Sequence, residues 1–233
     1  MISTLKKELK KLGNPKKAKI LQGFFKTGKG EYGEGDVFLG ISVPDSRKIS
    51  LKYKDLPPSD IEKLLESKIH EERLIALLIL VHNFQHTNEK QKIYNFYLKH
   101  TKYINNWDLV DLSAHYIVGA YLNDKPKNIL LKLAKSKSIW DKRIAIISTY
   151  YFIRNQKSAE WTFKISEILL NDKHDLIHKA VGWMLREVGK NISQKVEEEF
   201  LIKYYKKMPR TMLRYAIERF PIDLKSKYLN GMV

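Results

Sequence analysis

The sequence predicts an all-α protein, and three observations support this prediction. Apolar residues recur at helical spacing along nearly every segment, and the segments are separated by breaks about every 12 to 18 residues. Runs in which β-branched residues alternate with polar ones, as they do in strands, are only a few positions long. The chain has 233 residues, of which 43% are apolar and 30% are charged. A chain of this length and composition can bury a core. We expect residues 1–233 to form a single domain of many short helices.

Helix starts can be located in order along the chain. Leu5, Leu9 and Leu12 form the apolar stripe of a first helix. Later starts carry a capping side chain or a proline, which the first helical turn tolerates because its N–H has no partner inside the helix. These starts are Asn14-Pro15, the capping box from Ser59 to Glu62 after Pro57-Pro58, Pro126 and Pro209.

Four basic residues that precede small and apolar residues indicate an internal repeat. Arg73 and Arg143 are 70 residues apart, Lys179 follows after 36 and Arg214 after a further 35. The first interval is twice about 35 residues, and the segment around Trp107 fills the gap. A period near this length with two helices per unit is typical of an α-solenoid superhelix of HEAT-like helix pairs.

Equivalent helices of a solenoid line one concave surface, so the repeat predicts a basic stripe along it. Lys179 and Trp183 are four residues apart, and Arg186 follows on the same helix face. The alternative is that the basic residues pair with acids such as Glu72, Asp141 and Glu187.

The overall charge favours a stripe that binds a polyanion. Lys and Arg number 43 against 26 Asp and Glu, which leaves a formal net charge of +17. Such an excess indicates nucleic acid first and an anionic membrane surface second. The absence of cysteine excludes disulfides and thiolate catalysis.

The apolar runs of the chain are short. The longest run, from Leu74 to Val81, is well below the roughly 20 residues that a membrane span needs. The lysine-rich N-terminus lacks the apolar core of a secretory signal. We expect a cytoplasmic, nucleoid-associated protein.

Trp107 and Asp111 are an unusual pair in so basic a chain. Four residues apart on a helix, they share one face. An indole face attracts cations, and a carboxylate can stabilise developing positive charge or hold a water. The structural alternative is a core indole and a solvated or capping acid, but Asp108 already stands near the helix start. A carboxylate in a groove that binds phosphates repels them, so the presence of Asp111 there indicates a catalytic role rather than a binding role.

Two other features are weaker indications of a nucleotide site and of a metal site. The glycine-rich loop from Thr27 to Asp36 comes close to a phosphate-binding sequence, but Gly30 replaces the magnesium-binding hydroxyl and a helix precedes the loop. We expect a flexible lid or a backbone contact to phosphate. The His82/His86 and His174/His178 pairs have helical spacing, but no third metal ligand is indicated.

Four ordered motifs carry a resemblance to a known family. The stretches 38–47, 106–111, 140–146 and 178–187 read FLGISVPDSR, NWDLVD, WDKRIAI and HKAVGWMLRE. Together they resemble the AlkD-type DNA alkylation repair glycosylases, from about Pro15 to about Phe220. The glycine-rich loop looks longer than the family's corresponding connection.

The resemblance implies a HEAT-like solenoid that grips duplex DNA and releases N3- and N7-alkylated purines without enclosing the lesion in a deep pocket. It implies lesion-facing indoles at Trp107 and Trp183, a catalytic carboxylate at Asp111 and a backbone-holding arginine at Arg143. Further DNA contacts are expected from the resemblance or the repeat at Arg47, Arg73, Lys179, Arg186 and Arg214.

No metal, cofactor, nucleotide or membrane partner is expected, and we expect a monomer. Some relatives with altered motifs bind DNA without excising bases. The alternatives are therefore a non-catalytic nucleic-acid-binding solenoid that recognises damaged or branched DNA and, less in keeping with the charge, a protein scaffold.

Overall fold

The prediction of an all-α fold is confirmed. The computed structural model describes all 233 residues, and their only β pairing is an isolated bridge between Val37 and Ile69. The chain contacts gather into two compact units, unit 1 (Met1–Ser113) and unit 2 (Ala114–Val233). The single-domain assignment stays a prediction. No helix combines the length and apolar character needed to cross a membrane.

Unit 1 is organised around one buried helix. Its elements are α1 (Ile2–Leu12), α2 (Pro15–Phe24), α3 (Val43–Lys52), α4 (Pro58–Leu65), α5 (His70–His86), α6 (Lys90–Lys99), the 3₁₀ turn η1 (Thr101–Tyr103) and α7 (Trp107–Asp111). Every residue of α5 from His70 to Val81 is buried, and α3 and α4 pack against this helix. The stretch from Leu74 to Val81 is apolar on all sides, and such a stretch is stable only when neighbours cover it.

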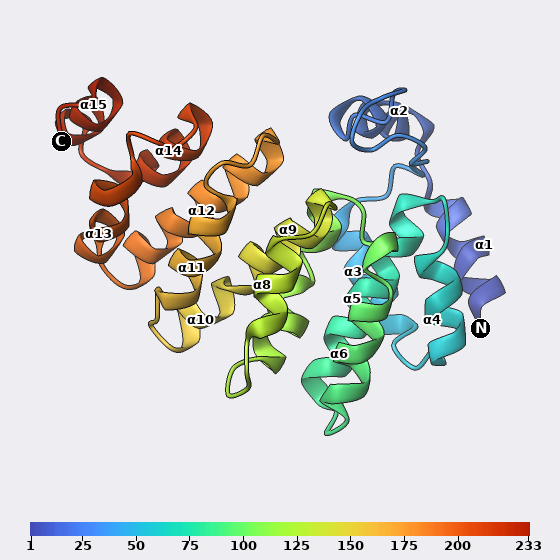
Figure 1. The fold of residues 1–233 in the computed structure, drawn as a ribbon. Helices are drawn as coiled ribbons and strands as arrows, with labels where there is room; N and C mark the ends of the chain where they lie inside the picture. The colour runs from blue at the N-terminus through green and yellow to red at the C-terminus, as the bar shows by residue number, and fades with distance from the viewer. The chain divides into compact units, whose positions relative to one another are not determined.

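Helix α2 differs from the other α-helices of unit 1, because none of its residues is buried. It stands apart from the other helices of the unit in Figure 1. Ile20 and Phe24 on this helix are 70% and 62% exposed. The chain is tied back to the unit just after α2, where Phe25 is buried and stacks on Phe38 at 4.9 Å between ring centroids.

Unit 2 is likewise built on a long central helix. Its elements are the π-helical turn η2 (His115–Gly119), α8 (Asn128–Ala134), α9 (Ile139–Ser148), α10 (Tyr150–Asn155), α11 (Glu160–Leu169), α12 (Asp175–Asn191), α13 (Gln194–Tyr204), α14 (Arg210–Ala216), the 3₁₀ turn η3 (Ile217–Arg219) and α15 (Ile222–Asn230). The central helix α12 packs against α9, α13 and, most extensively, α14. Contacts between helices close in sequence are typical of solenoids.

Some of the predicted helix starts are confirmed and others are wrong. Asn14 caps α2, with its Oδ1 accepting a hydrogen bond from the Lys17 N–H at 3.1 Å. The capping box at Ser59 is wrong, because the helix already begins at Pro58, whose fixed φ suits the first position. Pro126 precedes its helix by two residues, and Pro209 is the N-cap of α14 rather than part of the first turn.

Candidate functional site

The short helix α7 carries the pair that the sequence singles out. The Oδ1 of Asn106 accepts a hydrogen bond from the Trp107 N–H at 2.8 Å and so caps the helix. Trp107 is the first residue of α7 and Asp111 the last, so one turn separates them. Both side chains are half-buried, whereas Leu109 and Val110 between them are fully buried. The buried residues anchor the helix and leave the pair within reach of a ligand.

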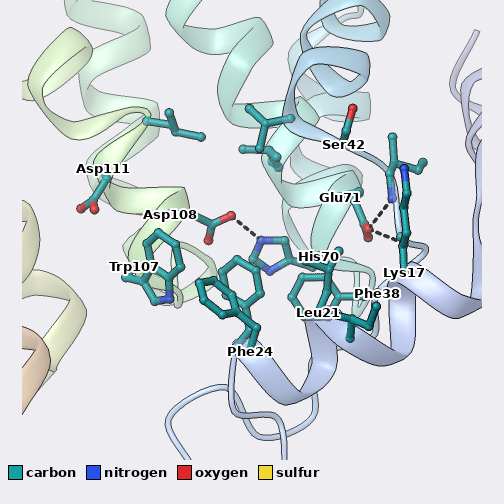
Figure 2. A pocket seen from close by; sticks show the side chains of 17 residues that line it. Lys17, Leu21, Phe24, Phe38, Ser42, His70, Glu71, Trp107, Asp108 and Asp111 are labelled. Atoms are coloured by element: carbon teal, nitrogen blue, oxygen red, sulfur yellow. Dashed lines mark hydrogen bonds and ion pairs between the residues drawn. The ribbon is translucent and has the colours of Figure 1, made fainter.

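Trp107 and Asp111 line the same cavity of unit 1, which has a volume of about 550 Å³. Most of its wall is apolar and comes from α2, the segment 38–43, α5 and α7 (Figure 2). Lys17 of α2 also reaches it. In such surroundings the charge of a carboxylate acts over a lower effective dielectric than in water. Asp111 can therefore act strongly on a positive charge that enters here.

The indole of Trp107 is held by other aromatic rings. It stacks on Phe25 at 4.9 Å with an interplanar angle of 13°, and the ring of Phe24 meets it edge-on at 5.8 Å. Phe38 stacks on the far side of the row against His70, at 4.4 Å. The spacing that marks Trp107 and Asp111 in the sequence does not mark Phe24 and Phe25. The available signal was the pair of consecutive aromatic residues between a basic helix and a glycine-rich loop.

A buried polar network lies behind this aromatic row. The protonated ring of His70 donates through both nitrogens, to Asp108 Oδ2 at 2.8 Å and to Asp36 Oδ2 at 3.1 Å. Arg73 donates to Asp36 Oδ1 at 2.6 Å, and the amide of Asn106 donates to Asp36 Oδ2 at 3.2 Å. All five residues are buried. The network joins the end of the glycine-rich loop, the start of α5 and the start of α7.

His70 is protonated at neutral pH in this network. Burial by itself opposes the charge, but the attraction and hydrogen bond of Asp108 and the hydrogen bond of Asp36 outweigh it and raise the pKa of His70 to about 9. Burial also opposes the charge of Asp36, yet the hydrogen bond from His70 and the charge of Arg73 lower its pKa. The network therefore holds two cations and two carboxylates.

Glu71 fixes another wall of the cavity. Its carboxylate accepts hydrogen bonds from the backbone N–H groups of Leu39 at 2.9 Å, Gly40 at 2.8 Å and Ile41 at 3.2 Å. Gly40 has a φ of +83°, and a Cβ there would overlap the carbonyl oxygen of Asn14. The turn therefore requires glycine, and Glu71 satisfies its buried amides.

The glycine-rich loop is closed by its own acids. Glu31 accepts from the Gly28 N–H at 2.9 Å, and Glu34 accepts from the Gly30 N–H at 2.8 Å. These amides are the groups that an incoming phosphate would use, and carboxylates of the same loop already hold them. The structure adds a structural role for the loop, since its last residue, Asp36, belongs to the buried network.

In unit 2, Glu187 connects two of the predicted site residues. It accepts a hydrogen bond from the Trp183 indole N–H at 3.2 Å and lies 3.9 Å from the Arg186 guanidinium. Arg186 also pairs with Glu218, and the Trp183 ring lies 6.2 Å from that of Tyr150. Trp183 and Arg186 are both half-buried. Their orientation is set by carboxylates as well as by packing.

The predicted basic stripe is not uniformly exposed, which corrects the expectation from the repeat. Arg73 is 4% exposed and bound to Asp36, while Arg143 is 5% exposed and donates to the Leu176 carbonyl at 2.7 Å. Lys179 is half-buried and pairs with Asp175 at 2.7 Å. Buried guanidinium groups need hydrogen-bond partners, and here the protein supplies them. The exposed predicted DNA contacts are Arg47 and Arg214.

The histidine pairs serve the helices that carry them. The rings of His82 and His86 stack at 4.2 Å, and His86 Nδ1 bonds to the His82 carbonyl. His174 caps α12 by accepting from the Leu176 N–H. No group of three or more His, Cys, Asp or Glu residues has the arrangement to hold a metal ion.

Comparisons with known proteins identify a family and a shared fold. The sequence model of the family described as DNA alkylation repair enzyme matches residues 5–220. A solved structure described as a predicted DNA alkylation repair enzyme from Enterococcus faecalis is similar with a TM-score of 0.71 and 17% identity, over 90% of this chain and 97% of that one. That likeness shows a shared fold. No curated protein matches.

Proposed function

Because the chain belongs to the family of DNA alkylation repair enzymes, we propose that it is a DNA glycosylase of base-excision repair. Its substrates would be cationic N3- and N7-alkylpurines in duplex DNA, and its reaction the hydrolysis of their N-glycosidic bond. The observation that carries the proposal is the shared cavity wall of Trp107 and Asp111. An aromatic ring and a carboxylate in apolar surroundings suit a cationic group and the positive charge that develops on its sugar.

The chemistry makes modest demands on the protein. Alkylation leaves the purine positively charged, so the bond between it and C1′ breaks with the electron pair going to the base, and no strong acid is required. The sugar then resembles an oxocarbenium ion, as in glycoside hydrolysis generally. Asp111 would stabilise this charge and orient a water, whose oxygen bonds to C1′ and whose proton passes to the carboxylate. Neutral alkylpurine and an abasic site result.

The remaining site residues would bind rather than react. The face of Trp107 would attract the cationic nucleotide by on the order of 0.5 to 2 kcal/mol, and the face of Trp183 is a candidate for a contact of the same kind. Arg47, Lys179, Arg186 and Arg214 would contact the DNA backbone. Arg143 is less suited to clamp a phosphate than the sequence suggests, since it would have to give up its bond to the Leu176 carbonyl.

Replacing Asp111 by Asn tests the proposal directly. The change keeps the shape of the side chain but removes its negative charge, so release of 3-methyladenine and 7-methylguanine from methylated duplex DNA should be abolished while DNA binding is nearly retained. Asp124→Asn, at an exposed position next to Lys125, is the matched control and should release bases at the wild-type rate.

Two other outcomes would decide against the proposal in different ways. Base release by Asp111→Asn at the wild-type rate would refute the role of this carboxylate. Salt-dependent DNA binding by the wild type without any base release would instead indicate the non-catalytic DNA-binding alternative.

A further inference from the structure

The buried network around His70 joins the proposed site to the interior of unit 1. Three segments meet in it, since Asp36 ends the glycine-rich loop, His70 and Arg73 begin α5, and Asp108 lies in the first turn of α7. Asp108 lies between Trp107 and Asp111 in sequence, on a helix of five residues. A helix this short is not stable by itself and depends on tertiary contacts.

The two cations and two carboxylates of the network balance in charge, but the two carboxylates receive different numbers of hydrogen bonds. Asp36 receives hydrogen bonds from His70, Arg73 and Asn106. Asp108 receives one from His70 through Oδ2, and its Oδ1 is buried without a hydrogen-bond partner. An uncompensated buried carboxylate is costly. The position of Asp108, and with it that of α7, therefore depends on the cation at His70.

We propose that His70 is a positioning residue that acts through Asp108 to hold α7 in the orientation that presents Trp107 and Asp111 to DNA. The inference rests on the proposed function of that pair. The charged groups that face His70 are Asp36 from the loop, Asp108 from α7 and Arg73 from its own helix. The rings of Phe25 and Phe38 close the site around it.

The first test separates positioning from binding. His70→Gln keeps hydrogen-bonding capacity but removes the cation, so single-turnover base release should fall by about tenfold to a hundredfold while DNA affinity changes little. In His70→Gln/Asp108→Asn the network is again neutral, and part of the rate should return. His86→Gln, on the last turn of the same helix, is the control and should match the wild type.

The pH profile gives a second readout that a purely structural role would not produce. His70 has a raised pKa, so the charged network persists in the folded protein until the pH rises through about 9, and its stabilising contribution is complete only below the ordinary pKa of 6.5. The wild-type release rate should therefore decline near pH 9. His70→Gln should lack this step. Wild-type release rates and an unchanged pH profile in folded His70→Gln would overturn the proposal.

A spectroscopic test needs no catalysis and keeps His70 in place. In a variant with Trp140, Trp161 and Trp183 replaced by Phe, the emission of Trp107 should change with a midpoint near pH 9, as His70 loses its proton. An emission that does not respond near this pH would overturn the inference, even if His70→Gln failed to fold. The absence of base release by the wild type, together with the emission change in this variant, would refute the proposed function alone.

Discussion

At the scale of single residues, the partners of a charged side chain decide what it can do. Arg73 is basic and lies within a repeat of basic residues, yet it is buried against an aspartate 37 positions earlier in the chain. The same is true of Arg143, which bonds to a backbone carbonyl 33 positions later. Residue type alone therefore does not identify a phosphate contact. The exposed Arg47 and Arg214 remain available for one.

Glu197 provides a residue-scale prediction about pH and stability. Burial and the nearby charge of Glu198 raise its pKa from 4.5 to about 9, although Arg186 opposes this. Below pH 4.5 folded and unfolded chains both hold the proton. As pH rises from there toward 9, only the unfolded chain releases it, so wild-type stability is progressively lost.

Glu197→Gln carries no charge at any pH and avoids this loss. It should increase the free energy of unfolding by about 2 to 3 kcal/mol at pH 7 and by almost nothing at pH 4. Urea unfolding at both values measures the difference, with the exposed Glu199→Gln as control. An equal change in the free energy of unfolding at the two pH values would show that the Glu197 carboxyl is not neutral at pH 7 in the folded protein.

At the scale of helices, Asp111 occupies a helix position at which three other helices carry a basic residue. Arg143, Lys179 and Arg214 are each the fifth residue of α9, α12 and α14, and Asp111 is the fifth residue of α7. An acid thus replaces a base at the same helical register. The shared register is a property of the helices alone, since Arg143 is buried on the Leu176 carbonyl and Lys179 pairs with Asp175.

Helix packing in unit 2 can be tested at one glycine. A Cβ at Gly182 of α12 would overlap the backbone carbonyl of Met212 and the Cβ of Tyr215 on α14. Gly182→Ala should therefore lower the free energy of unfolding by about 1 to 3 kcal/mol. Gly23→Ala is the matched control, because no atom lies within 4 Å of its added Cβ.

The control variant Gly23→Ala should itself change the free energy of unfolding, in the opposite direction. Gly23 lies near the end of α2, where alanine should stabilise the helix by about 0.5 to 1 kcal/mol. Urea unfolding measures both variants. Wild-type stability in Gly182→Ala would show that α12 and α14 can separate without cost.

At the scale of the whole molecule, the net charge of +17 predicts how DNA binding responds to salt. The logarithm of affinity for duplex DNA should fall linearly with the logarithm of salt concentration, because bound cations release counterions from DNA. Arg47→Ala and Arg214→Ala should each reduce the slope by about 0.9 if each removes one phosphate contact. Fluorescence anisotropy measures the slope.

Lys92, which pairs with Glu89 and is not among the expected contacts, is the control. Lys92→Ala should leave the slope unchanged. DNA affinity that is indifferent to salt would contradict a nucleic-acid-binding surface and favour a scaffold for protein partners.

The sequence by itself determined the all-α class, several helix positions and the pairing of Trp107 with Asp111. These depend on periodicity, capping and spacing within one helix, which are local properties. Only the tertiary structure decided which basic residues are buried, and it brought Asp36, His70 and Asp108 together. Their separations of 34 and 38 residues leave no periodic trace in the sequence. Such contacts form only when packing brings distant segments together, so spacing along the chain cannot reveal them.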